Sequence, residues 1–246
     1  MPMLNIKNPP LKTFRIDFKF KKPEKISFEM MGKVEKLLEK DYPNIPSIDI
    51  LEYPFDVQTA IKLPIQIGPI RFLNEEKKGH VQLFSNGLIF IFTEYSNWDD
   101  IKDHIIDLVL ESCKILKLNN IEQFRMEYID EFTFLKKEFD LRNYFSLNIN
   151  KTEKWNVDFN DFHIGIKINT QENDKFIIRL RGLPSKEKES FLFRLESLFI
   201  KNRTFLIDER SILMNELNKT HDIIINYFFN IMSENLKRIL GVEKID

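Results

Sequence analysis

An aspartate interrupts an apolar row in the segment RMEYIDEF, residues 125–132. With the two-residue period of a β-strand, Asp130 shares a face with Tyr128 and Phe132. Apolar surroundings raise the pKa of a carboxyl group, which suits a general acid or base. Alternatively, the carboxylate is structural and accepts hydrogen bonds from the backbone, Arg125 or Tyr128. A third interpretation is that a bulge or a strand end turns Asp130 outward, and the structural interpretations are favoured over catalysis.

Two further acid–base candidates lie in the C-terminal part of the chain. Asp208 stands just before a long helical pattern, where an aspartate would be an N-cap that accepts hydrogen bonds from free backbone N–H groups. His221 lies on the apolar seam of that pattern, between Leu217 and Ile224. A histidine in such a seam is typically a core residue with one hydrogen-bond partner. It would form an acid–base pair if it met Asp130 or Asp208, and otherwise it fixes how the helix docks.

Several cations have a spacing that suits anion binding. Arg179 and Arg181 alternate with apolar residues and therefore share one face of a strand. With Lys167 on a neighbouring strand they would line a concave basic surface, although a solvated outer face is the more ordinary outcome. Arg125 lies on the opposite face from Asp130, as an exposed or edge-binding group. The candidate binding residues are Arg125, Tyr128, Lys167, Arg179 and Arg181.

The motifs of most familiar enzyme classes are absent from the sequence. The chain has 7 glycines and contains no GxGxxG or phosphate-binding loop, and it lacks HExxH, CxxC and GxSxG. Its histidines, at positions 80, 104, 163 and 221, do not have the spacing of metal ligands. The sequence therefore predicts no cofactor and no metal, and it favours a protein without enzymatic activity.

Composition and charge narrow the class of protein. Of 246 residues, 43% are hydrophobic and 30% charged, as in a globular chain, and 23 phenylalanines predict a well-filled core. The net charge of −1 disfavours general binding to nucleic acid. The single cysteine, Cys113, falls in a helical pattern, which indicates a buried structural thiol and a reducing compartment. No apolar run has the length of a signal core or a membrane span, so we expect a cytoplasmic location without membrane contact.

The elements that must position these residues follow from periodicity and capping signals. The pattern predicts strands over residues 11–20, 121–135, 155–170, 175–182 and 191–207, extended segments over 44–70, and a hairpin over 80–95 with a type I′ turn at Asn86-Gly87. Helices are predicted after a Ser27 cap, after a Ser96 or Asn97 cap, briefly within 139–145, and from about 209 to 240 with Gly241 as the C-cap.

This order of elements predicts an α+β fold in which long helices pack on antiparallel sheets. Both halves read as strand, helix, several antiparallel strands and long helix. We therefore expect a single integrated unit over residues 1–246 with a possible internal duplication into β-α-β-β-β-α halves, 1–120 and 121–246.

Four segments and one histidine also resemble a sporadically distributed family of bacterial proteins of similar length with no assigned activity. The matching segments are NPPLKTFRIDFKF, HVQLFSNGLIFIFTEYSNWDD, FRMEYIDEFTF and FLIDERS, followed by a final helix with His221. The third segment of the family usually reads Arg-Tyr-Ile-Asn, whereas here two residues separate Arg125 from Tyr128. The resemblance covers nearly the whole chain, so it implies one integrated unit. The patchy distribution of the family implies genes that travel with mobile or defence loci.

Three hypotheses of function follow. The first is a non-catalytic cytoplasmic binding protein with a protein partner, a second copy of itself or a small ligand, which would be an accessory component of a defence or toxin–antitoxin locus. The second is a hydrolase acting on a phosphate-containing or nucleotide substrate. Its acid–base set would be Asp130, Asp208 and His221, with Arg179 and Arg181 as an anion clamp. The third, disfavoured by the charge balance, is a nucleic-acid binder that uses a basic concave sheet with interleaved aromatic side chains.

Overall fold

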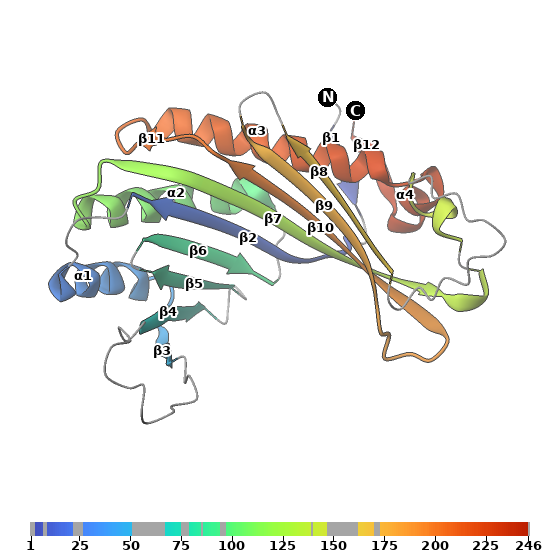
Figure 1. Cartoon of the computed structure of the whole chain (residues 1–246), viewed down its shortest axis with the longest axis horizontal. Helices are drawn as coiled ribbons and strands as arrows, with labels where there is room; N and C mark the ends of the chain where they lie inside the picture. Colours follow the sequence, from blue (N-terminus) through green and yellow to red (C-terminus); the bar gives the residue numbers. More distant parts are fainter. Residues whose placement is uncertain are drawn as a thin grey trace, which may run out of the picture. The chain divides into compact units, whose positions relative to one another are not determined.

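The computed structural model of the chain confirms the predicted α+β class (Figure 1). It describes residues 3–6, 9–21, 27–50, 67–74, 79–84, 86–93, 97–138, 140–146, 162–169 and 173–245. The helices are α1 (Phe28–Glu39), α2 (Trp98–Ile115), α3 (Arg210–Ile231) and α4 (Glu234–Leu240), with short 3-10 turns at Lys136–Glu138 and Leu141–Asn143. None of these helices, within the described residues, is long and apolar enough to cross a membrane.

The strands form one large antiparallel sheet and one small sheet. In chain order they are β1 (Met3–Ile6), β2 (Leu11–Phe20), β3 (Asn44–Ile50), β4 (Ile67–Asn74), β5 (Gly79–Phe84), β6 (Gly87–Phe92), β7 (Asn120–Leu135), β8 (His163–Asn169), β9 (Lys175–Leu183), β10 (Ser190–Lys201), β11 (Phe205–Leu206) and β12 (Val242–Ile245). The path of the large sheet is β3-β4-β5-β6-β2-β7-β10-β9-β8, with β11 paired to β7, while β1 pairs with β12.

The chain divides into two compact units. Unit 1 consists of Met1–Phe14, Arg125–Asn202 and Leu213–Asp246, and unit 2 consists of Arg15–Phe124 and Arg203–Ile212. The division within β7 lies close to the predicted boundary at residue 120, but each unit also takes a segment from the other half. Strands β2 and β7 contribute residues to both units, so one integrated unit stays our prediction. The internal duplication also stays a prediction.

The helices of unit 2 begin after capping residues that the sequence predicts. The Ser27 hydroxyl accepts a hydrogen bond from the N–H of Met30 and begins α1, as predicted. Asn97, the second of the two predicted candidates, caps α2 by accepting from the N–H of Asp99. Helices α1 and α2 contact each other. Burial raises the pKa of the Cys113 thiol on α2 to about 12, which agrees with a structural role for this residue.

The β5–β6 hairpin is present, but Gly87 lies in β6 and not in the predicted turn. Gly87 pairs with Phe84 and is the first residue of β6. Gly87 does not have the positive φ that a type I′ turn at Asn86-Gly87 would require. A Cβ atom on Gly87 would lie 2.5 Å from the carbonyl oxygen of Phe18. The glycine is therefore needed for close strand packing and not for the turn.

In unit 1 the predicted long C-terminal helix is two helices. Helix α3 buries Leu213, Leu217 and Ile224 as predicted, but it ends at Ile231. Ser233 caps the new helix α4 by accepting from the N–H of Leu236, and its own N–H donates to the carbonyl of Tyr144. A new cap and a backbone tie thus break the continuous pattern. Gly241 ends α4 in the left-handed conformation, with φ 66°, as expected of a C-cap glycine.

The remaining predicted strands of unit 1 are found where the structure describes the chain, but the predicted short helix is replaced by a 3-10 turn. The predicted segment 191–207 consists of β10 and β11, and the predicted short helix near residue 142 is a single 3-10 turn. Of the strand predicted over residues 155–170, β8 accounts for His163–Asn169, and residues 155–161 lie outside the described part of the chain.

Candidate functional site

Asp130 lies in the apolar row of β7 and does not interrupt the strand. Alternate residues stay buried along the strand from Phe124 to Phe134, and Asp130 itself is only 4% exposed. The strand runs without a break through residues 120–135. The interpretation that a bulge or strand end turns Asp130 outward is therefore wrong. The expected partnership with Arg125 also fails, because Arg125 is exposed on the opposite face of the strand.

The carboxyl group of Asp130 is held in its neutral form by its surroundings. Burial raises its pKa from 3.8 to about 8, and no charged group among the described residues offsets this effect. An uncharged carboxyl can be buried at much lower cost than a carboxylate. The setting resembles that of a general acid, but the group has almost no access to solvent or to a substrate.

Tyr128, which is buried, and His221, which is partly exposed, meet within unit 1. The hydroxyl of Tyr128 and Nδ1 of His221 share a hydrogen bond of 2.7 Å, which joins β7 to α3. The ring centroids of these residues are 5.9 Å apart, and Phe14 packs on Tyr128 with centroids 4.9 Å apart. His221 is thus the partnered seam histidine that the sequence suggests. Tyr128, predicted as a binding residue, lies on the buried face of β7 and is 4% exposed.

Asp208 has a different place from the other two acid–base candidates. It belongs to unit 2, whereas Asp130 and His221 belong to unit 1. It is exposed in the turn that follows β11. The predicted N-cap role is wrong by one residue, because α3 begins at Arg210 and Glu209 directly precedes it. The carbonyl of Glu209 accepts the N–H of Ile212, as expected at that position.

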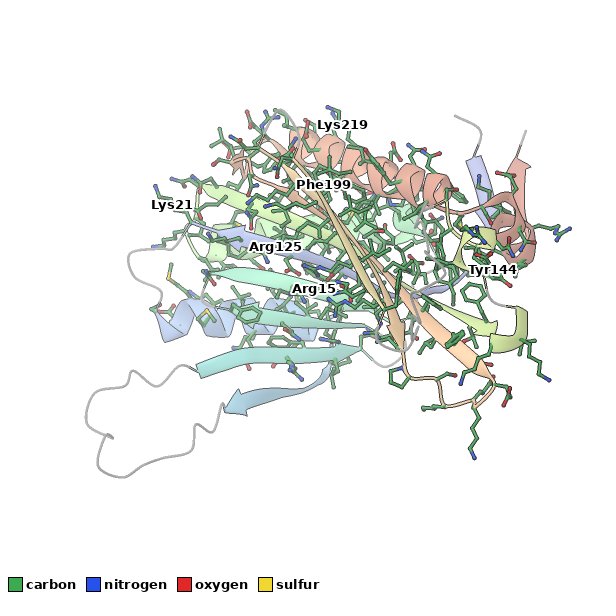
Figure 2. The ribbon with its side chains drawn as sticks, turned by 45° about the vertical axis from the view of Figure 1, so that its right-hand side comes forward. Arg15, Lys21, Arg125, Tyr144, Phe199 and Lys219 are labelled. Carbon is green, nitrogen blue, oxygen red and sulfur yellow. The ribbon has the colours of Figure 1, made fainter. Side chains whose placement is uncertain are left out.

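The other predicted binding residues share the outer face of the unit 1 sheet, which is the face opposite the buried row of β7. Arg179 pairs with Glu196 on β10 and with Gly165 on β8, and Arg181 pairs with Arg194 and His163. Lys167 pairs with Ile177, one alternate residue before Arg179. Arg194 contacts Glu131 of β7 at 2.6 Å, which places the alternate β7 residues, including Arg125, on this face. We call the set Arg125, Lys167, Arg179, Arg181 and Arg194 the arginine face; Arg125 is labelled in Figure 2.

Two glutamates hold the arginines of this face in place. Oε2 of Glu196 lies 3.2 Å from Nη1 of Arg179 and 3.4 Å from Nη2 of Arg181. The Glu196 side chain is 10% exposed, whereas the two arginines are 34% and 40% exposed. Oε1 of Glu131 accepts two hydrogen bonds from the Arg194 guanidinium. The carboxylates therefore lie beneath cations that reach the solvent, and the charged pairs keep the guanidinium groups ordered.

Aromatic side chains of unit 1 gather on the other face of its sheet. Phe176 on β9, Phe193 and Phe199 on β10, and Phe132 and Phe134 on β7 are all buried. On the outer face of the described strands β7 to β10, the alternate positions hold charged and aliphatic residues together with glycine and polar residues such as histidine, asparagine and threonine, and none holds Phe, Tyr or Trp. The interleaved aromatic side chains expected of a nucleic-acid-binding sheet are thus not found on this face.

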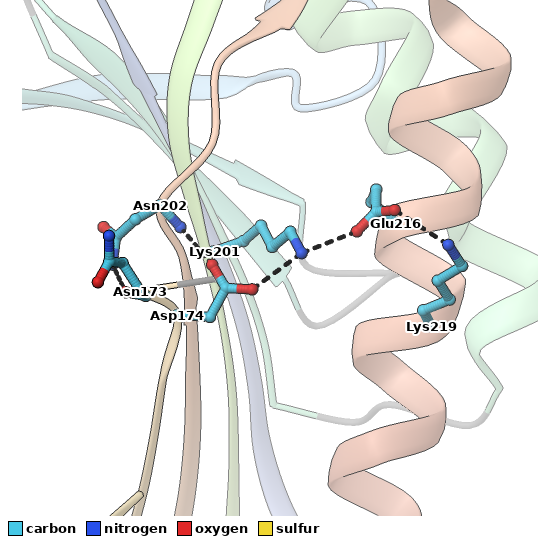
Figure 3. A network of polar contacts seen from close by, with 6 residues as sticks. All are labelled: Asn173, Asp174, Lys201, Asn202, Glu216 and Lys219. Carbon is cyan, nitrogen blue, oxygen red and sulfur yellow. Dashed lines mark hydrogen bonds and ion pairs between the residues drawn. The ribbon is translucent and has the colours of Figure 1, made fainter. Parts of the chain in front are cut away.

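A buried ionic network that periodicity does not reveal joins α3 to the β9–β10 region (Figure 3). Lys201 Nζ lies 2.8 Å from Oδ2 of Asp174 and 3.0 Å from Oε2 of Glu216, and all three side chains are at most 12% exposed. Oδ1 of Asp174 also accepts the backbone N–H of Asn202. Glu216 pairs on its other side with the exposed Lys219. These residues come from a turn, a strand end and a helix, so no short motif marks them.

No group of three or more His, Cys, Asp and Glu side chains that could hold a metal ion occurs among the described residues. The structure joins Tyr128 with His221, and it gathers Arg125, Lys167, Arg179 and Arg181 on one face, to which it adds Arg194, Glu131 and Glu196.

A scan against protein-family models finds no family that matches this chain. A search of curated proteins likewise finds no matching relative.

Proposed function

We propose that this chain is a non-catalytic interaction protein that binds an acidic surface of a protein partner through the arginine face. The observation that carries the proposal is the gathering of five cations, from β7, β8, β9 and β10, on one face of the unit 1 sheet. Arginine is enriched at the energetically important positions of protein interfaces because its planar group binds carboxylates in two places at once.

The composition of the face favours a protein over a nucleic acid. Aliphatic side chains such as Ile177 and Leu198 lie between the charged residues, and both are partly exposed. Glu127, Glu131 and Glu196 share the face with the cations. A nucleic-acid backbone would meet these carboxylates with repulsion, whereas a protein surface can place both signs of charge to match them. The five cations exceed the three glutamates, so the partner should carry excess acidic residues.

The placement of the acid–base candidates argues against the hydrolase hypothesis. Asp130 has almost no exposed surface, Asp208 belongs to unit 2, and the partly exposed His221 is hydrogen-bonded to the buried Tyr128. A catalytic group must come within hydrogen-bond reach of its substrate. A cytoplasmic setting near a defence or toxin–antitoxin locus is part of the proposal, and it is supported by the resemblance of the four sequence segments.

Affinity capture with the tagged full chain tests the proposal. Extract treated with nuclease is passed over the chain, and retained material is eluted with salt and identified by mass spectrometry. Each retained protein is then purified and titrated against the chain by calorimetry. We expect an acidic protein that binds with a defined stoichiometry and is released by salt, because the contact is largely electrostatic. Failure of every retained protein to bind the chain in calorimetry, or retention of only a small molecule detected by native mass spectrometry, would overturn the proposal.

A further inference from the structure

We propose that Gly165 forms the floor of an oxyanion-binding notch on the arginine face, where Arg179, Arg181 and Lys167 bind one phosphoryl or carboxylate group. That the group belongs to a protein partner rests on the proposed function; the notch itself rests on the local geometry. No metal, cofactor or catalytic step is involved.

The notch follows from the register of β8 and β9. Gly165 lies directly opposite Arg179, and His163 lies directly opposite Arg181. Lys167 is the next residue of β8 on the same face. Among the residues that the structure describes, a Cβ atom added to Gly165 would meet only Nε2 of His163, at 3.9 Å, and Gly165 is itself exposed. The surface above Gly165 is therefore open, and the side chains around it are cationic or hydrogen-bonding.

Glu196 orders the two guanidinium groups without blocking them. One of its oxygens serves both arginines, at 3.2 and 3.4 Å, and each guanidinium carries five N–H donors. The carboxylate is 10% exposed, so a ligand that approaches from the solvent meets the cations first. The Nε atom of Arg181 is buried and finds no hydrogen-bond acceptor among the described residues. An unsatisfied donor of this kind is uncommon in a folded protein.

The chemistry of the lining selects an oxyanion. The guanidinium groups of Arg179 and Arg181 and the ammonium group of Lys167 are donors only, so they suit a ligand that offers acceptors only. Three cations against the single carboxylate of Glu196 leave a net charge of +2 around the notch. A phosphorylated side chain and an aspartate or glutamate side chain present the same oxyanion chemistry, and they differ in charge and in the number of oxygens.

Titration of the isotope-labelled full chain with inorganic phosphate, and separately with acetate, tests the notch. The ionic strength is held constant with sodium chloride, and two-dimensional NMR follows the backbone N–H of Gly165 and the Nε–H groups of Arg179 and Arg181. We expect these signals to shift and saturate, with tighter binding of phosphate than of acetate if the natural group is phosphoryl and comparable binding if it is carboxylate. Linear shifts spread over all surface cations would overturn the proposal.

The Gly165→Leu variant fills the notch and leaves every charge in place. We expect it to weaken phosphate binding by about tenfold or more, because the ligand loses its access to both arginines. The control is Asn169→Leu, which places the same leucine side chain on the same face of β8 beyond the notch. Both variants must give wild-type amide spectra away from the substitution. Equal phosphate binding by the wild-type chain and the Gly165→Leu variant would overturn the notch.

The two proposals fail in different ways. If the captured partner binds the Gly165→Leu variant as tightly as wild type but requires Arg179 and Arg181, the arginine face stands and the notch is wrong. If phosphate saturates the notch but no protein partner binds the face, the notch stands and the proposed function is wrong.

Discussion

The hydroxyl of Tyr128 lies 2.7 Å from Nδ1 of His221, and this hydrogen bond joins β7 to α3 inside unit 1. Each group satisfies a polar atom of the other that would otherwise be costly to bury. The pair is therefore a docking contact between strand and helix. No acid–base role is needed to explain why both residues are present.

A double-mutant cycle measures what this hydrogen bond contributes. Tyr128→Phe removes the hydroxyl, His221→Leu removes the ring nitrogens, and the double variant removes both. We expect each single variant to lower the free energy of unfolding by about 1–3 kcal/mol, with a coupling energy of about 1 kcal/mol between the sites. Urea denaturation followed by circular dichroism gives these values. Strictly additive effects would contradict the account of a shared hydrogen bond.

Asp130 should make the stability of the protein depend on pH. Its pKa in the folded protein, about 8, lies above that of an unfolded aspartate, so the folded state holds the proton more tightly. The resulting stabilisation is complete below about pH 4 and is lost as the pH rises through the folded-state pKa. As the pH rises from about 5 to about 8, the free energy of unfolding should fall in the wild-type chain. In the Asp130→Asn variant this fall should be smaller by about 2–4 kcal/mol.

Urea denaturation at several pH values checks this prediction. Asp208→Asn is the control, because it replaces an exposed aspartate in a turn. If the wild-type chain and the Asp130→Asn variant show the same dependence of unfolding free energy on pH, Asp130 is already ionised in the folded state.

Lys201 should be needed for the stability of the fold only while its carboxylate partners are present. Lys201→Met leaves Asp174 and Glu216 without their buried cation, and we expect it to lower the free energy of unfolding by about 3–5 kcal/mol. Replacing all three together, by Lys201→Met, Asp174→Asn and Glu216→Gln, should restore much of that stability, since no charge is then left buried. The exposed partner provides the control: Lys219→Met should cost less than about 1 kcal/mol.

Chemical denaturation of the three variants separates these cases. A triple variant that is no more stable than Lys201→Met would show that the network contributes specific hydrogen bonds and does more than balance charge.

Replacing two glycines of unit 2 by alanine should change the stability of the protein in opposite directions. A Cβ at position 87 would lie 2.5 Å from the Phe18 carbonyl oxygen, so Gly87→Ala must displace backbone and should destabilise by about 2 kcal/mol or more. Gly32, within α1, has nothing within 4 Å of the added Cβ. Gly32→Ala should therefore stabilise by about 0.5–1 kcal/mol through helix propensity. Thermal unfolding of both variants checks the pair, and a harmless Gly87→Ala would contradict the observed strand packing.

Local patterns predict most elements of this fold because their causes are local. The alternation in 11–20 and 121–135, the Ser27 cap and the Gly241 cap each depend on residues within one turn or strand. The errors arise where a distant group decides. Gly87 lies in β6, where only a residue without a Cβ fits beside the Phe18 carbonyl, and the last helix breaks where Tyr144 receives the N–H of Ser233. No short-range pattern contains either contact.

The candidate site likewise combines features that local patterns predict with features that depend on distant residues. Strand parity alone places Arg179 and Arg181 on one face and Tyr128 and Asp130 on the buried face of β7. Parity cannot show which residue of the next strand lies opposite, so the roles of Glu196 and Gly165 depend on register. Asp208 illustrates the converse, since its type suits a helix cap but the backbone begins the helix one residue later.

Calorimetry with the purified partner tests most directly whether the arginine face binds it. One variant combines Arg179→Gln, Arg181→Gln and Glu196→Gln, which removes the charges without leaving a buried carboxylate alone. The matched control combines Arg142→Gln, Arg238→Gln and Glu234→Gln, three exposed residues outside the arginine face. We predict that the first variant raises Kd by about tenfold or more while the control changes it by less than about twofold. Equal affinity of both variants and wild type would contradict the account.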